Sequence, residues 1–276
     1  MAFAVPEALS PSKVASFTDC ALAFRYSAID RLPQPPAPWS TKGTLVHMAL
    51  ERLHLLDGPE RTLDAALGLL AEAATDLRDD PDYADLELDA EAEAEFLADA
   101  AELVRRYFQL EDPCGIKAIG VELSLDVNIE GVRLRGIIDR LELDANGELV
   151  VTDYKTGSVP SVNFERKRLS GVHLYSLLCE ELLGKRPARV QLLYLRQPVA
   201  IITEPTDQST RGTRRSLAAV WQAVERACER EDFRPRPSRL CDYCAYQPYC
   251  PAFGGSLEPA PVTLTTTSTD SLVTVG

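Results

Sequence analysis

Three successive strand patterns joined by short turns constrain the fold of this chain more than any other feature. Apolar and polar residues alternate over residues 120–129 (GVELSLDVNI), and a second strand pattern covers residues 132–143 (VRLRGIIDRLEL). Such alternation is typical of half-buried strands. The tetrapeptide DANG at residues 144–147 is a strong hairpin signal and leads into a third strand at residues 148–154. We therefore predict a three-stranded antiparallel meander.

Helical patterns occur on both sides of the predicted meander. They cover residues 13–26, 41–56, two or more segments within 60–110, 163–183 and 207–230, with strand patterns at 188–195 and 199–204. This order predicts a mixed α/β core rather than a doubly wound nucleotide-binding fold. The chain contains neither a Walker-type phosphate loop nor a GxGxxG motif, so we do not expect nucleotide-driven motor activity.

These patterns predict one domain over residues 1–254. It would comprise a mainly helical part at 13–112, an α/β core at 119–230 and a cysteine-rich segment at 234–254. The last residues, 255–276, are rich in Ser, Thr and Pro and offer little apolar surface to bury, so we expect a disordered tail.

The net charge of −13 is unevenly distributed along the chain. Residues 57–112 carry 18 acidic and 4 basic residues, so the rest of the chain is close to neutral. We interpret this acidic block as a solvated helical face, and it does not exclude a polyanionic partner for the remainder. No signal peptide and no apolar run of membrane-spanning length is present, so we expect a cytoplasmic protein without a membrane partner.

Two acidic residues end neighbouring strand patterns. Asp139 follows the apolar run GII, and Asp153 follows LVVT, with Lys155 two residues later. The hairpin between them would bring the two carboxylates close, and such a pair repels unless a cation lies between. Oxygen ligands of this kind suit Mg²⁺ or Mn²⁺, which can activate water for phosphodiester hydrolysis. A surface ion pair is the commoner explanation of an isolated D-x-K triplet.

Several motifs in order resemble the RecB-like exonuclease branch of the PD-(D/E)XK nuclease superfamily. That family has G-x-x-x-H on a helix, an isolated Glu, G-x-x-D, D-x-K on the next strand and Q-x-x-x-Y on the following helix. The matching residues are Gly43 and His47, then Glu122, then Gly136 and Asp139, then Asp153 and Lys155, and finally Tyr175. The resemblance extends from about Cys20 to Cys250. The chain departs from the pattern at Gly171, where the family has Gln.

The resemblance implies a restriction-endonuclease-like core with a helical N-terminal insertion. It also implies roles for individual residues. The metal ligands would be His47, Asp139, Asp153 and the backbone carbonyl of Tyr154, with Lys155 as the catalytic lysine and Glu122 and Tyr175 in support. Gly171 would leave the site without one side chain that contacts DNA or organises the site.

Four of the seven cysteines form a candidate metal site. Cys241, Cys244 and Cys250 are clustered in CDYCAYQPYC, and Cys20 near the N-terminus is the best candidate for a fourth ligand. Four thiolates are compatible with either Zn²⁺ or a [4Fe–4S] cluster. The arrangement resembles the iron–sulfur staple of AddB-type nucleases, so we favour the cluster. It would close the C-terminal lid onto the N-terminal helix and stabilise the fold.

We therefore expect a divalent-metal-dependent DNA nuclease, an exonuclease that cuts from ends or on single strands and acts in repair or recombination. Basic residues flank the candidate site in sequence and are candidates for phosphate contacts. They are Arg166–Arg168, Lys185 and Arg186, and Arg211, Arg214 and Arg215. Two alternatives stay open: a catalytically weak, metal-stapled DNA-binding module that recruits a helicase or repair-complex partner, and a nuclease fold used for protein assembly through the acidic block.

Overall fold

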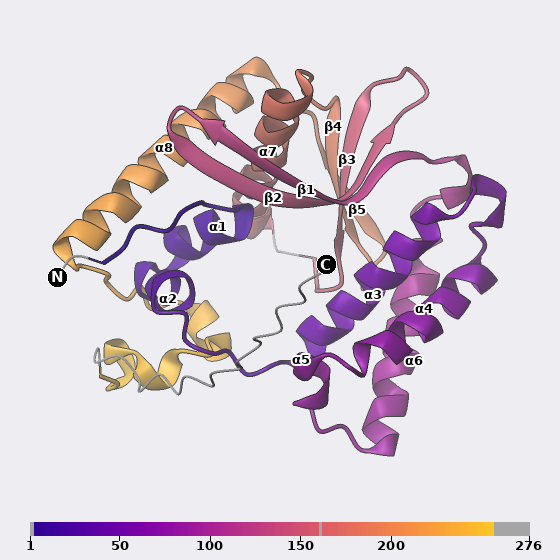
Figure 1. Ribbon diagram of the computed structural model, residues 1–276, viewed down its shortest axis with the longest axis horizontal. Helices are drawn as coiled ribbons and strands as arrows, with labels where there is room; N and C mark the ends of the chain where they lie inside the picture. The colour runs from indigo at the N-terminus through magenta and orange to yellow at the C-terminus, as the bar shows by residue number, and fades with distance from the viewer. Residues whose placement is uncertain (1–2, 160–161, 257–276) are drawn as a thin grey trace, which may run out of the picture.

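The structure is a computed structural model that describes residues 3–159 and 162–256 (Figure 1). The expected tail from residue 257 onward lies outside the described residues, as do the side chains of Arg166–Arg168. None of the described helices combines the length and apolar character that crossing a membrane requires.

A single five-stranded sheet forms the centre of the structure, in the order β1-β2-β3-β4-β5. Its strands are β1 (Lys117–Ile129), β2 (Val132–Leu143), β3 (Leu149–Lys155), β4 (Arg189–Tyr194) and β5 (Val199–Thr203). The first three strands pair antiparallel, which confirms the predicted meander. β3 and β4 run parallel, because helix α7 (Val162–Leu183) carries the chain across between them. β5 returns antiparallel to β4.

Helices cover both faces of this sheet (Figure 1). The remaining helices are α1 (Pro11–Asp19), α2 (Ala21–Phe24), α3 (Pro38–Leu55), α4 (Leu63–Leu77), α5 (Pro81–Ala84), α6 (Ala90–Tyr107) and α8 (Asp207–Arg230). A π-helical turn follows α2 over Arg25–Ile29, and short 3-10 turns lie at Gly58–Glu60, Pro113–Gly115, Arg239–Tyr243, Gln247–Tyr249 and Pro251–Phe253. This mixed α/β architecture confirms the fold class predicted from the sequence.

One predicted helix is interrupted. The sequence pattern favours a continuous helix over residues 13–26, but Cys20 has an extended backbone (φ −158°, ψ 109°) that separates α1 from α2. A single extended residue ends the i→i−4 hydrogen-bond series, and apolar periodicity does not reveal such a break because Leu22 and Phe24 are still buried.

Two apolar cores lie on opposite faces of the sheet. The larger one packs α1, α2, α7 and α8 against strands β1 to β4. The second packs α3, α4 and α6 against Tyr154, Leu193 and Leu195 at the ends of β3 and β4. Leu45, Leu50 and Leu53 of α3 are completely buried in this second core, and burial of each contributes about 1.5–3 kcal/mol. Helix α3 is therefore held beside the end of β3.

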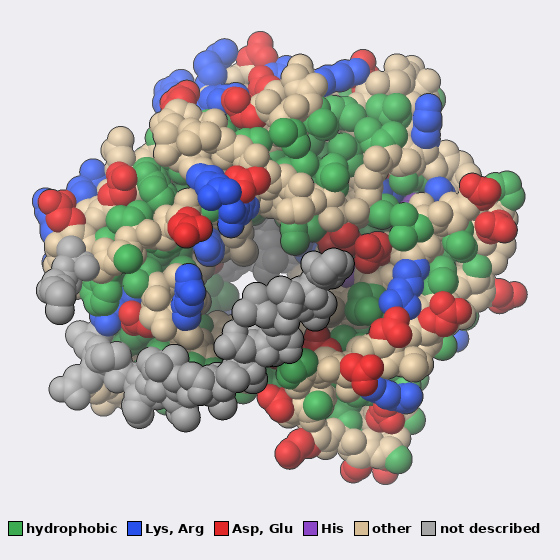
Figure 2. All heavy atoms as spheres, in the orientation of Figure 1, with side chains coloured by type: hydrophobic (Ala, Val, Ile, Leu, Met, Phe, Trp, Pro, Cys, Tyr) green, Lys and Arg blue, Asp and Glu red, His purple; other side chains and the backbone are tan. Residues whose placement is uncertain are grey.

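The acidic block forms α4, α5 and α6. None of its acidic side chains is buried, and Figure 2 shows acidic side chains gathered over these helices in the lower right of the view. Salt bridges such as Arg52–Asp76 (2.6 Å) and Arg78–Glu93 (2.9 Å) lie on this exposed surface. The interpretation as a solvated helical face is confirmed.

A buried histidine connects α3 to the sheet. His54 Nε2 lies 2.8 Å from Tyr107 Oη and 3.0 Å from Arg140 Nη1. An arginine only donates hydrogen bonds, so this nitrogen must be unprotonated to accept one. Burial, with the positive charges of Arg140 and Arg61, lowers the pKa of His54 to about 2.

We predict that acid destabilises the fold through His54. Because its folded-state pKa lies below the ordinary value of about 6.5, the unfolded chain binds the extra proton; this contribution to stability is complete above pH 6.5 and decreases below it. Between pH 7.5 and 5.5 the linkage amounts to about 1.4 kcal/mol. Urea unfolding at both pH values should show that His54→Gln reduces the loss by this amount. An equal loss in both proteins would contradict a neutral buried His54.

Candidate active site

Glu122 and Asp139 face each other on β1 and β2 at an interruption in the sheet. Ladder pairs continue to either side of these two residues but not between them. Glu122 has φ 44°, in the left-handed region that side chains other than glycine rarely adopt. Strain of this kind is found mainly at functional sites, where the surrounding structure holds it in place.

Asp153 occupies the equivalent position on β3. The regular β2–β3 ladder ends at the pair Arg140 and Thr152, so Asp139 and Asp153 are the next residues on the two strands. Beyond the end of the ladder, the side chain of Asp139 connects the two strands, because its Oδ2 accepts a hydrogen bond from the backbone N–H of Tyr154 at 2.7 Å. Three adjacent strands thus each contribute one carboxylate at the same level of the sheet.

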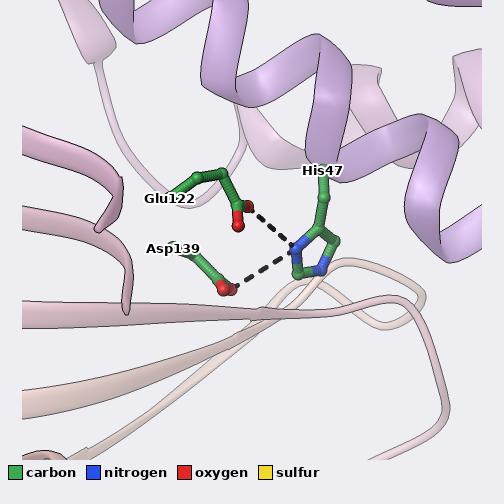
Figure 3. Close-up of side chains that lie close together, drawn as sticks. All are labelled: His47, Glu122 and Asp139. Atoms are coloured by element: carbon green, nitrogen blue, oxygen red, sulfur yellow. Dashed lines mark ion pairs between the residues drawn. The ribbon is translucent and has the colours of Figure 1, made fainter. Parts of the chain in front are cut away.

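His47 reaches two of these carboxylates from α3. Its Nδ1 lies 3.6 Å from Glu122 Oε1 and 3.6 Å from Asp139 Oδ2 (Figure 3). Ligand atoms of the three residues all lie within 4.8 Å of one another. One turn earlier, a side chain at Gly43 would place its Cβ 3.1 Å from Thr156 Oγ1. The glycine therefore lets α3 approach the end of β3 closely enough to present His47.

Lys155 and Tyr175 both contact Asp153. Lys155 Nζ forms an ion pair with Asp153 Oδ2, and Tyr175 Oη lies 3.4 Å from Asp153 Oδ1. Tyr175 comes from α7, which crosses β2 closely at Gly136, where an added Cβ would lie 2.6 Å from Leu178 Cδ1. Gly136, the glycine of G-x-x-D, therefore allows α7 to pack closely on the sheet.

The charges at this site are unbalanced. Burial, together with the negative charge of Asp153, raises the pKa of Asp139 to about 7. Burial lowers the pKa of His47, but its hydrogen bond to Glu122 and the charges of the carboxylates outweigh burial, so the pKa is raised. Burial and the charge of Asp153 also raise the pKa of the Tyr175 hydroxyl. Burial is the largest cause of the raised pKa of Asp139 and Tyr175, and negative charge raises the pKa of all three groups. A bound cation would offset that charge.

The donor set fits a divalent cation. Two carboxylates and one imidazole offer hard oxygen ligands and one nitrogen ligand, and the nitrogen favours Mn²⁺ over Mg²⁺. The structure therefore gathers His47, Glu122 and Asp139 into one group, while Asp153 lies beside Lys155 and Tyr175. The sequence placed Glu122 in a supporting role and Asp153 among the ligands; the role of each residue stays a prediction.

Position 171 on α7 is open. A Cβ built at Gly171 would meet nothing within 4 Å, so the structure has room for the glutamine that the family carries there. His173, two residues later, is half-buried and its pKa is lowered by burial. None of the described contacts places it at the carboxylate site.

The four predicted cysteine ligands line one cavity of about 690 Å³. Cys20, Cys241, Cys244 and Cys250 are all free thiols. Burial raises the pKa of Cys244, and the three other thiols raise it further, so the four lie within electrostatic reach of one another. The extended backbone that interrupts the N-terminal helix places Cys20 in this cavity.

Two backbone groups near this cavity are directed at sulfur atoms. The N–H of Arg236 lies 3.4 Å from Cys20 Sγ, and the N–H of Ser238 lies 3.3 Å from Cys241 Sγ. Within the described part of the chain, no three cysteine sulfurs approach to within 4.8 Å of one another. The group is therefore wider than a site for a single ion.

Arg140 is a residue of the site region that the sequence reasoning missed. It is completely buried directly after Asp139, and its Nη1 donates to Tyr154 Oη at 2.7 Å. The signal was present in the sequence: Arg140 and Glu142 interrupt an apolar strand pattern, and buried charges are paired.

Comparisons with known proteins bear on the family and the fold of the chain. The family model of the PD-(D/E)XK nuclease superfamily matches residues 8–251. The Gene 69 protein of Mycobacterium phage D29 is 25% identical over 269 residues, covering 88% of this chain and 96% of that protein. The Gene 69 protein of Mycobacterium phage L5 is 24% identical over 285 residues, with the same coverage.

A solved structure from Eubacterium rectale named "Putative exonuclease" has the same fold. Its TM-score is 0.56 at 12% identity, and the match covers 87% of this chain and 88% of that one. At this identity the likeness concerns the fold alone. The family match extends over both apolar cores, the carboxylate site and the cysteine-lined cavity, and the chain belongs to the PD-(D/E)XK nuclease superfamily.

Proposed function

We propose that this protein is a divalent-metal-dependent deoxyribonuclease that hydrolyses phosphodiester bonds in DNA. The observation that carries the proposal is the alignment of Glu122, Asp139 and Asp153 on three adjacent strands, with His47 and Lys155 beside them. Superfamily membership supports the reaction class. The missing pair between Glu122 and Asp139, and the end of the β2–β3 ladder just before Asp153, support a functional rather than structural role.

Each residue has a distinct part in the proposed mechanism. His47, Glu122 and Asp139 would hold a divalent cation, with Asp153 and the carbonyl of Tyr154 completing its surroundings. When bound, such a cation polarises a phosphate and makes bound water a nucleophile at neutral pH. The Lys155 ammonium is one-third exposed and would orient the attacking water or stabilise charge on the phosphate. Tyr175 would fix the orientation of Asp153.

We predict that Asp153→Asn and Lys155→Met each reduce DNA cleavage about 100-fold or more, because each removes a charge that acts in the transition state. The measurement is Mn²⁺-dependent cleavage of end-labelled single-stranded DNA. Lys117→Met is the matched control, since this exposed lysine at the start of β1 is not among the basic residues predicted to contact phosphates. Undiminished cleavage by both site variants would contradict the assigned mechanism.

Fewer basic residues are available to contact DNA phosphates than the sequence suggested. Arg186 pairs with Asp207 at 2.5 Å and Arg214 with Glu181 at 2.6 Å, so part of the basic charge is offset within the protein. Arg211 and Arg215 are exposed on α8 and are the better candidates for phosphate contacts. End-directed or single-strand cleavage, a role in repair or recombination, a helicase partner and a cytoplasmic location stay predictions.

We predict that Gly171→Gln stabilises the protein and improves its use of DNA. A glycine in a helix interior costs about 0.5–1 kcal/mol relative to alanine, and the position is open. Both Gly171→Gln and Gly171→Ala should raise the free energy of unfolding by this amount in urea titrations. Only the Gln variant should lower KM for DNA. Destabilisation by both substitutions would contradict the open helical position.

We also propose that the cysteine-lined cavity holds a [4Fe–4S] cluster. A tetrahedral Zn²⁺ site at about 2.3 Å per bond brings its sulfurs to about 3.8 Å, whereas no three of these described sulfurs lie within 4.8 Å of one another. A four-iron cluster binds each thiolate through a different iron and so suits the wider group. The N–H groups of Arg236 and Ser238 support this proposal, because hydrogen bonds to sulfur are common around such clusters.

The cluster predicts a brown protein on anaerobic purification, with about four irons and matching acid-labile sulfide per chain. Cys244→Ser should lose the colour and the iron, whereas Cys114→Ser should keep both, because Cys114 is exposed and away from the cavity. A colourless protein with one zinc per chain would contradict the cluster and support a zinc site.

Gly171 favours one second candidate, a metal-stapled DNA-binding module with weak or no catalysis. In that case the protein binds DNA without divalent metal, and the Asp153→Asn variant binds as tightly as the wild type while neither cleaves. The two candidates are therefore separated by the same cleavage assay combined with a binding measurement in EDTA.

A further inference from the structure

Helix α3 carries two histidines on the same face. His47 and His54 are seven residues apart, which is close to two helical turns and about 10 Å along the axis. His47 contacts Glu122 and Asp139, whereas His54 contacts the buried guanidinium of Arg140. The same helix therefore touches the carboxylate site at one point and a buried polar network at another.

Arg140 is the centre of that network and is completely buried. Its guanidinium contacts groups from both halves of the molecule. From the sheet these are Glu142 Oε2 (2.6 Å), Tyr154 Oη (2.7 Å) and Thr152 Oγ1 (3.1 Å), and from the helical part they are His54 Nε2 (3.0 Å), Tyr107 Oη (3.3 Å) and the Glu111 carboxylate. Two carboxylates more than neutralise the arginine, and charge-assisted hydrogen bonds hold its guanidinium. Within the described residues, the other ring nitrogen of His54, Nδ1, is buried without a hydrogen-bond partner.

Two residues of the network directly follow residues of the carboxylate site in the sequence. Arg140 follows Asp139 on β2, and Tyr154 follows Asp153 on β3. The regular ladder between these strands ends at Arg140 and Thr152, so the contacts of the guanidinium with Thr152 and Tyr154 continue the connection where backbone pairing stops. The distance between Asp139 and Asp153 therefore depends on the contacts between the neighbouring Arg140 and Tyr154 side chains.

Apolar burial and hydrogen bonding constrain α3 in different ways. Leu45, Leu50 and Leu53 bury the helix, but the free energy of hydrophobic burial is non-directional and does not by itself select one axial position. Hydrogen bonds are directional, and the bond between His54 and Arg140 is satisfied at only one axial position of the helix. At that position His47 Nδ1 lies 3.6 Å from both carboxylates.

We propose that the contact between His54 and Arg140 is a latch that sets the position of α3, and through it the position of His47 in the metal site. His54 and Arg140 are positioning residues, since neither touches the proposed metal or the DNA. The inference rests on the proposed metal-dependent function and deepens it, because it places a determinant of metal affinity about two helical turns away from the ligands.

The test is Mn²⁺ affinity of the full-length, metal-free protein, measured by isothermal titration calorimetry without DNA. His54→Leu removes the acceptor and should weaken Mn²⁺ binding about 10- to 100-fold, the usual cost of losing a group that orients a ligand. His54→Gln keeps an acceptor and should retain most of the affinity. Arg52→Gln, on the exposed side of α3, is the matched control and should leave affinity unchanged.

A double-mutant cycle tests whether the effect passes through His47. In a His47→Ala background, His54→Leu should weaken Mn²⁺ binding little further, because the ligand that it positions is already gone. A loss of the same size in both backgrounds, or no loss in the wild-type background, would overturn the latch. If His54→Leu does not fold by circular dichroism, His54→Phe, which keeps an aromatic ring but removes the acceptor 3.0 Å from Arg140 Nη1, takes its place with the same expected pattern and at least a several-fold loss.

The same titration separates this inference from the proposed function. Wild-type protein that binds Mn²⁺ while the variants bind equally well would overturn the latch alone. Wild-type protein that binds no Mn²⁺ would overturn both the latch and the metal-dependent nuclease.

Discussion

Mutual repulsion among three carboxylates at one level of the sheet is the constraint on which the rest of the structure depends. Glu122, Asp139 and Asp153 lie where β2 loses its regular pairing with β1 and β3, and burial raises the pKa of Asp139 to about 7. The fold holds these groups together only because other interactions compensate. Lys155 pairs with Asp153, the Tyr154 N–H donates to Asp139, and His47 approaches from α3.

The two apolar cores position these compensating groups. The larger core holds α7 against the sheet at Gly136 and so brings Tyr175 to Asp153. The second core holds the helical part against the other face and brings α3, with His47, to the end of β3. The acidic helices α4 and α6 thus contribute to the site by supporting α3, while their charges stay exposed to solvent.

The sequence predicted the meander, the order of elements and Asp139 and Asp153 as possible neighbours across the hairpin, because period-two alternation and the DANG turn limit the strand register. It did not predict the left-handed backbone of Glu122 or the break at Cys20, since single-residue backbone conformations leave no periodic signal. The network around Arg140 was also missed: its members come from four separated segments, and only tertiary packing brings them together.

The central claim is that His47, Glu122 and Asp139 form a divalent-metal site. Anomalous diffraction from crystals grown with Mn²⁺ tests it most directly, because the signal locates the ion without reference to activity. The structure predicts an anomalous peak within bonding distance of His47 Nδ1 and of carboxylate oxygens of Glu122 and Asp139. A fully occupied Mn²⁺ peak elsewhere on the protein, with none between these three side chains, would contradict the claim.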